Sequence, residues 1–184
     1  MILPITVYGN PILKKEADWV DENQEGIQEL IANMFETMYH ANGVGLAAPQ
    51  VDYSLNLFII DTAPMIDEES EEKPLKAVFI NAEIIEISGE ETSFNEGCLS
   101  VPDINENVIR KSTVKISYQD ENFVEHTKTF DGMLARVIQH EYDHIIGKTF
   151  IDRLPNIKKM LLKGKLNDIS TGKKKTFYNT KLNK

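Results

Sequence analysis

The residues with the strongest chemical signature are His140, Glu141 and His144, in the segment HEYDH at positions 140–144. If this segment is helical, the two histidines lie one turn apart on the same face, because an α-helix advances about 100° per residue. Both imidazoles can then bind one metal ion, and Glu141 can reach a water beside that ion. The alternative is a surface helix with two solvated histidines. The chain has only four histidines, which disfavours a chance match.

Cys98 is the single cysteine, so it cannot form an intramolecular disulfide. Its remaining roles are packing, nucleophilic attack or metal ligation. A catalytic zinc-type site commonly uses three protein ligands and leaves the fourth position to water, so the two histidines need one more ligand. A bound ion also keeps a thiol deprotonated. We therefore interpret Cys98 as the third metal ligand rather than as a small buried hydrophobic residue.

Three stretches together resemble peptide deformylases: GVGLAAPQ at 43–50, EGCLS at 96–100 and QHEYDH at 139–144. Members of this family remove the formyl group from N-formylmethionyl termini of nascent polypeptides and release formate. The resemblance extends over most of residues 1–165. It implies one divalent metal ion held by Cys98, His140 and His144, with Fe(II) in the cell and Zn or Ni in preparations. The sequence itself shows only the ligand set, since imidazole and thiolate suit several of these metals.

The resemblance also implies roles for other residues in these motifs. Glu141 would take a proton from the attacking water and deliver it to the departing amine. The Gln50 side-chain amide and the Leu99 backbone N–H would donate to the oxyanion of the tetrahedral intermediate. In isolation, Gln50 would be an ordinary polar residue after Pro49. Gly45 leaves room for a substrate backbone to pair with a strand edge.

Several further positions are candidates for substrate binding. An apolar pocket for the methionine side chain is predicted from Val44, Leu46, Met133 and Val137. Gly97, in the turn that carries the cysteine, is another candidate.

Glu96 either orients this turn or pairs with Arg110, and the sequence does not rank the two roles. We expect the stem of Arg136 to pack while its charged head reaches solvent. Some bacterial relatives carry an arginine shortly after the EGCLS turn that helps to hold substrate. The present chain has none before Arg110, which leaves substrate affinity open.

The elements that must position these residues follow from periodicity. Apolar residues at spacings of three and four predict an amphipathic helix from near Asp21 or Asn23, with Gly43 as the stop signal. Segment 43–51 is too irregular for a helix or an ordinary strand. Segments 55–61, 76–81 and 82–91 are predicted as strands, with an acidic exposed loop at 63–73. Residues 108–130 predict a hairpin around residues 120–122, with His126 facing solvent.

The second predicted helix carries the HEYDH segment. Asp131 is its expected N-cap and Gly147 its end, and Pro155 begins a short helix through about Lys165. Strands that pair through hairpins favour an α+β fold, with antiparallel β-sheets around this central helix, an N-terminal amphipathic helix and a C-terminal helix and tail. We predict one catalytic domain at residues 1–165 and a basic tail at 166–184.

Composition adds limits on location and partners. The apolar content of 41% is ample for a core, and no run of about 18 apolar residues predicts a membrane span. A single cysteine and the absence of a signal-peptide pattern indicate a cytoplasmic protein.

The net charge is −9, but ten of the twenty Lys and Arg residues lie in residues 153–184, beside one acidic residue. This basic end is either a solvated terminus or an electrostatic contact for the ribosome. Aromatic residues near it are few, so no specific DNA binding is expected.

Two other functions fit parts of this pattern. A generic zinc peptidase with an H-E-x-x-H motif usually takes a third ligand further along the chain, but residues 145–184 contain no His and no Glu. An RNA-binding or ribosome-associated module could hold a structural ion with Cys98, His140 and His144. Structural zinc generally needs four protein ligands, and no second cysteine exists. Both functions are therefore weaker predictions than deformylation.

Overall fold

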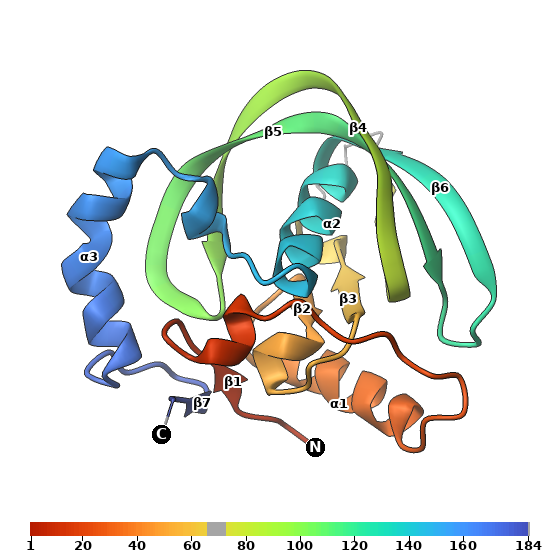
Figure 1. Ribbon diagram of the computed structural model, residues 1–184, viewed down its shortest axis with the longest axis horizontal. Coiled ribbons are helices and arrows are strands. Elements are labelled where there is room, and N and C mark those ends of the chain that lie inside the picture. Colours follow the sequence, from red (N-terminus) through yellow and green to blue (C-terminus); the bar gives the residue numbers. More distant parts are fainter. Residues whose placement is uncertain (66–72, 184) are drawn as a thin grey trace.

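The computed structural model describes residues 1–65 and 73–183. Within them, a five-stranded antiparallel sheet has the order β2-β3-β4-β5-β6, and a separate parallel pair joins β1 to β7 (Figure 1). The strands are β1 (Ile5–Thr6), β2 (Gly45–Ala47), β3 (Leu57–Asp61), β4 (Lys76–Cys98), β5 (Val101–Gln119), β6 (Glu125–Asp131) and β7 (Thr180–Lys181). The α-helices are α1 (Ile27–His40), α2 (Gly132–Ile145) and α3 (Asn156–Ser170), and short 3-10 turns include η2 (Ala48–Val51) and η4 (Phe150–Arg153). The predicted α+β class, with antiparallel sheet around a central helix, is confirmed.

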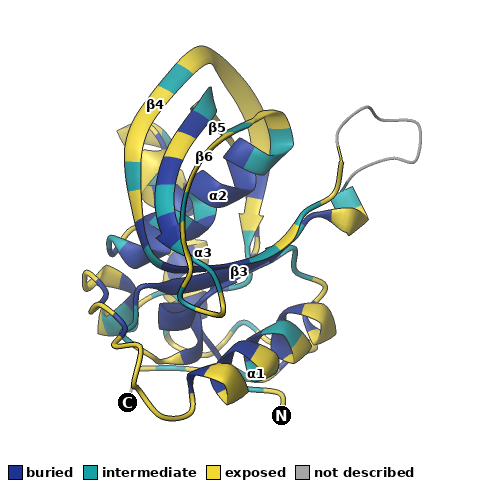
Figure 2. Ribbon diagram, turned by 90° about the vertical axis from the view of Figure 1, so that its right-hand side faces the viewer, coloured by how far each residue is buried: buried dark blue, intermediate teal, exposed yellow. Residues whose placement is uncertain are grey.

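The core has two layers because side chains of a strand point alternately to opposite faces of the sheet. In β3, Phe58 and Ile60 pack in the cluster that contains α2, whereas Leu57 and Ile59 pack in the cluster that contains α1. The two helices thus cover opposite faces of the sheet. Helix α2 is mostly buried, whereas α1 exposes one side to solvent (Figure 2).

Strands β4 and β5 form a long bent ribbon that arches over α2 (Figure 1). The sequence predicted separate strands with a break near residue 81, but β4 is continuous. Asn81 adopts a left-handed φ of 52°, and its side chain exchanges hydrogen bonds with both backbone groups of Val20. Four register shifts along the β4–β5 pair let the ribbon curve without ending. The curvature brings Cys98, at the end of β4, back to α2.

The N-terminal helix begins later than predicted. Asp21 and Asn23 lie in a turn in which the Asp21 carboxylate accepts the Asn23 N–H at 2.8 Å, so this side chain stabilises the turn and not a helix. Helix α1 begins at Ile27, after Gly26 at φ 81°, and ends at His40. Its apolar stripe packs on the sheet as predicted.

Segment 43–51 is also more regular than predicted. It contains strand β2, paired with β3, and turn η2. Three strand residues are too few to produce a visible alternation in the sequence.

Two polar side chains near opposite ends of β6 make contacts that the sequence did not predict. Asp131 occupies the N-cap position of α2 without a side-chain cap, because its carboxylate accepts the Thr113 hydroxyl at 2.6 Å. His126 is partly buried, with its Nε2 atom 2.7 Å from Asp120. Gly147 ends this region at φ 68°, where a Cβ atom would lie 2.6 Å from the Lys14 carbonyl oxygen.

The C-terminal helix is longer than predicted. Helix α3 continues to Ser170, since Leu166 and Ile169 remain on its buried face with Leu162. The predicted boundary between residues 165 and 166 therefore falls inside a helix, and the division into domain and tail stays a prediction. Most of the predicted acidic loop, residues 66–72, lies outside the described residues. No helix in the described part of the chain is long and apolar enough to cross a membrane.

Candidate active site

The two histidines of α2 project from one face of this helix. Their ring centroids are 5.4 Å apart, as expected for positions one turn apart. His144 is fully buried, and this burial lowers its pKa well below the usual value. A neutral imidazole is the form that binds a metal ion.

Cys98 meets these histidines from the opposite side. It ends β4 and pairs with Val101 of β5, so Leu99 and Ser100 form a tight turn. The Cys98 Sγ atom is 3.3 Å from His144 Nε2, and one ligand atom from each of Cys98, His140 and His144 lies within 4.8 Å of the others. Ligands of a tetrahedral metal ion are about 3.5 Å apart. The three residues therefore fit a mononuclear site with one sulfur and two ring nitrogens as donors.

Glu141 lies beside the same site and is buried. Burial raises its pKa to about 7, which suits a group that accepts and returns a proton. Its Oε2 atom has no hydrogen-bond partner among the described residues. A buried polar atom of this kind needs a partner, and an attacking water or a substrate amine can supply one.

Gly45 packs directly against this carboxylate. A Cβ atom at residue 45 would lie 2.3 Å from Glu141 Oε1, a distance that side chains do not tolerate. Because residue 45 has no side chain, the Glu141 carboxylate can lie against β2. The position of the Glu141 carboxylate therefore requires glycine at residue 45.

Gln50 is held at the edge of the site by turn η2. Its Oε1 atom accepts the Ala47 N–H at 2.8 Å, which fixes the amide. Its Nε2 group then points to the cysteine turn, 3.4 Å from Cys98 Sγ and 3.2 Å from Ser100 Oγ. A fixed N–H donor beside the metal ligands can stabilise negative charge that develops there.

Glu96 organises the surroundings of His140 through a buried charge network. Its carboxylate accepts a hydrogen bond from His140 Nδ1 at 2.9 Å, so Nε2 of that ring is left to face the site. It also binds Arg110 through two contacts of 2.7 and 2.9 Å. Although burial opposes the effect, hydrogen bonds from His140 and Arg110 lower the pKa of Glu96. The pairing of Glu96 with Arg110 is therefore present, whereas its orientation of the cysteine turn stays a prediction.

The network also contains residues that sequence reasoning missed. Asp143 binds Arg110 at 2.8 Å and is contacted by Arg153 of η4. The expectation that the head of Arg136 reaches solvent was wrong: its guanidinium is buried and donates to Glu96, Thr92 and the Val108 carbonyl. These partners come from distant segments, so local spacing carried no signal for them.

A cavity of about 550 Å³ opens onto these groups. The predicted residues that line it are Val44, Gly45, Gln50, Glu96, Gly97, Cys98, Leu99, Val137, His140 and Glu141. The other predicted site residues, Leu46, Met133 and His144, are absent from its wall. Leu46 points to the opposite face of β2 and packs with α1, and Met133 lies nearly two helical turns before His140. The wall also includes residues 175–178, which the sequence did not connect with the site.

Comparisons with known proteins agree with this geometry. The family model described as polypeptide deformylase matches residues 2–160. The chain belongs to the polypeptide deformylase family. A peptide deformylase from Christiangramia forsetii is 53% identical over 180 residues, covering 94% of this chain and 92% of the relative. One from Flavobacterium johnsoniae has the same identity and coverage.

Solved deformylase structures share the fold. The crystal structure of a peptide deformylase from Legionella pneumophila has a TM-score of 0.81 and 38% identity, covering 94% of this chain and 98% of that one. Peptide deformylase 1B of Arabidopsis thaliana, in complex with an inhibitor, has a TM-score of 0.82 and 30% identity, covering 93% and 92%. The chain is thus a deformylase, a hydrolase that removes formyl groups from nascent peptides. The family is metal-dependent, and Cys98, His140 and His144 form a possible metal site.

Proposed function

We propose that this deformylase acts on N-formylmethionyl termini through one divalent metal ion held by Cys98, His140 and His144. The observation that carries the proposal is the convergence of one sulfur and two ring nitrogens within 4.8 Å, beside a buried carboxylate. A divalent ion at this position would polarise the formyl carbonyl and increase the acidity of water. Fe(II) is our proposal for the cell, with Zn or Ni as substitutes in preparations.

The side chains around the ion supply the proton transfers and the oxyanion contacts. Glu141 accepts a proton from the attacking water and passes it to the departing methionine amine, so formate and a free N-terminus are the products. Gln50 Nε2 and the Leu99 N–H donate to the oxyanion, where preorganised donors are most effective. The raised pKa of Glu141 supports the first role, and the fixed Gln50 amide supports the second.

The substrate backbone is proposed to pair with β2. This strand is an edge of the five-stranded sheet. The Val44 carbonyl accepts the Asp61 N–H of β3, so the alternation of an antiparallel strand directs the Gly45 backbone groups to the open edge. Recognition through main-chain groups does not depend on later side chains, which suits an enzyme for many nascent chains. Val44, Gly97 and Val137 are proposed to contact the formylmethionine.

The deciding experiment is an assay of formate release from formyl-Met-Ala-Ser with metal-loaded protein. We expect formate and no cleavage of internal peptide bonds, whereas internal cleavage without formate release would favour a zinc peptidase. The Glu141→Ala variant should retain its metal and lose turnover, by about 10²-fold or more. Elemental analysis after anaerobic purification tests the proposal of Fe(II).

We propose that the enzyme is cytoplasmic and docks on ribosomes through the basic tail, residues 166–184. We propose no contact with membranes or with specific DNA sequences. Within the tail, Lys174 pairs with Asp103 and Lys181 pairs with Asp52, so part of its positive charge is already neutralised. Ribosome cosedimentation should weaken steeply as salt rises. Cosedimentation that does not change with salt concentration would contradict an electrostatic contact with the ribosome.

A further inference from the structure

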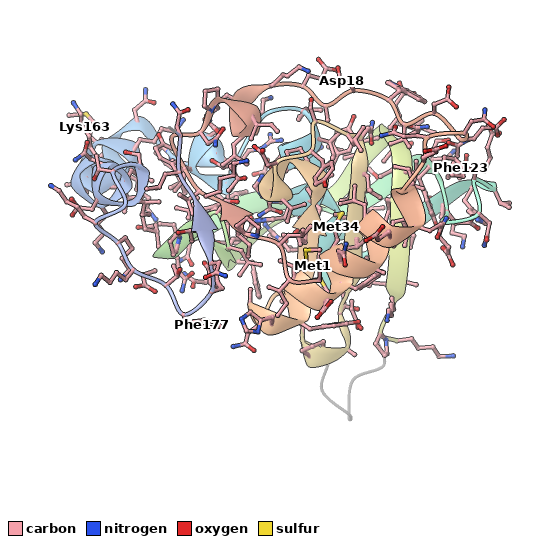
Figure 3. The ribbon with its side chains drawn as sticks, turned by 90° about the horizontal axis from the view of Figure 1, so that it is seen from below. Met1, Asp18, Met34, Phe123, Lys163 and Phe177 are labelled. Carbon is pink, nitrogen blue, oxygen red and sulfur yellow. The ribbon has the colours of Figure 1, made fainter. Side chains whose placement is uncertain are left out.

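The C-terminal segment, residues 175–178, forms one wall of the substrate cavity. Leu99, Pro102 and Asp103 line the same cavity, as do Cys98, His140 and Glu141. Phe177 is 68% exposed and lies near the margin of the molecule in Figure 3. The segment thus adjoins the path by which a peptide leaves the site.

This wall is held in place on both sides. The Tyr178 hydroxyl donates to the Leu99 carbonyl at 2.8 Å, which ties the segment to the cysteine turn. Immediately beyond it, the Ile5 N–H donates to the Asn179 carbonyl at 2.8 Å, and β7 pairs with β1. Before it, Lys174 forms an ion pair with Asp103. The backbone of the segment is therefore held next to the cavity.

Some charged side chains at the mouth of the cavity are paired with an opposite charge and others are not. Glu96 and Arg136 pair with each other, and Asp103 pairs with Lys174. Glu141 is buried deep in the site. Lys175 is exposed and lines the cavity, and the ion pairs found among the described residues do not include it. The free charge that a departing peptide meets at this wall is therefore positive.

We propose that Lys175 is a specificity-determining residue that favours formylated peptides with an acidic side chain at the second or third position after methionine. This inference rests on the proposed function, because it assumes that the formyl group lies at the metal ligands. An extended peptide advances about 3.3 Å per residue, so the second and third residues reach about 7–10 Å from the methionine, towards the rim. An exposed ion pair at that distance changes affinity by about two- to fivefold.

The experiment compares formyl-Met-Ala-Glu-amide, formyl-Met-Ala-Gln-amide and formyl-Met-Ala-Lys-amide, in which the amide removes the terminal carboxylate. We expect kcat/KM to fall from the Glu to the Lys peptide by about two- to fivefold at low salt, through KM and not kcat. Raising the salt concentration should shrink the difference. In Lys175→Gln the preference should disappear, and in Lys175→Glu it should reverse.

Lys163→Glu is the matched control, since it makes the same charge change on exposed α3, outside the cavity wall (Figure 3). It should retain the wild-type preference. Dissociation constants of the same peptides for Glu141→Ala protein, alone and combined with Lys175→Gln, provide a readout that needs no turnover. Equal affinities for the Glu and Lys peptides, or a preference that survives in Lys175→Gln, would overturn the proposal. Loss of formate release from all three peptides, with the affinity difference intact, would instead count against the proposed function.

Discussion

At the scale of single residues, Gly45 and Glu141 depend on each other. A methyl group at position 45 would overlap the Glu141 carboxylate, with contacts of 2.3–2.8 Å to its outer atoms. We predict that Gly45→Ala displaces this carboxylate and lowers kcat by about 10²-fold, because general base catalysis typically contributes that much. Metal content and the melting temperature should change little. Steady-state kinetics with elemental analysis check this, and an unaltered kcat would show that Glu141 can act from a shifted position.

Arg110 is the residue on which the buried charges depend most. It contacts Glu96 and Asp143, both almost fully buried, so its loss removes a buried cationic partner from two carboxylates. Arg110→Met should lower the free energy of unfolding by about 3–5 kcal/mol. It should also weaken metal binding by about 10- to 100-fold, through the loss of orientation at His140.

Urea unfolding and metal titration measure these two effects. Arg153→Met is the control, because Arg153 also contacts Asp143 but its side chain is 39% exposed. Its loss should cost about 1 kcal/mol or less. Equal losses in both variants would mean that burial does not distinguish the two arginines.

The residues proposed to carry the chemistry could be located from the sequence, whereas the residues that support them could not. His140, Glu141 and His144 share one short helical motif, and the single cysteine had few other roles. Arg136 and Asp143 belong to the same helix, yet their partners lie on β4, β5 and η4. Such partners depend on how the bent ribbon crosses the helix. A single sequence does not encode that crossing in any local pattern.

At the scale of elements, one residue of helix α3 lowers the stability of this helix. Gly164 is exposed within this helix, and a Cβ atom there would meet nothing within 4 Å. Gly164→Ala should raise the free energy of unfolding by about 1 kcal/mol, because glycine is a poor helix former. The melting temperature should rise by about 2–4 °C, while kcat stays unchanged. Thermal unfolding followed by circular dichroism tests this, and a lower melting temperature would contradict it.

The local sequence predicted that α1 and β4 exist, but it did not predict where these elements begin and end. The apolar stripe of α1 was evident, but its start was misplaced because Asp21 stabilises a turn that resembles a helix cap. Strand β4 was divided at Asn81, since the bonds that keep this residue in the sheet come from Val20 and Gln119. Both errors arise from tertiary contacts of polar side chains whose local preferences indicated something else.

At the scale of the whole molecule, the candidate metal site and the two main hydrophobic clusters are separate. The two main clusters lie between the sheet and helices α1 and α2, and Cys98 is only at the margin of a third. We predict that removal of the metal by a chelator abolishes formate release but leaves the fold intact. The melting temperature should fall, because an ion bound to the native state stabilises it by mass action.

Circular dichroism, thermal unfolding and activity after metal is restored check this prediction. Readdition of Fe(II) under anaerobic conditions, or of Ni, should recover activity. Global unfolding of the stripped protein would show that the ion is a structural requirement.

The pairing of β1 with β7 has a consequence for how the molecule is made. Nearly the whole described chain lies between Ile5 and Thr180, so this contact closes a very long loop and is expected to form late. Because residues 175–178 directly precede β7 and line the cavity, the wall that they form is expected to be completed only when β7 pairs with β1. A folding intermediate that lacks this pairing would therefore have one side of the cavity open.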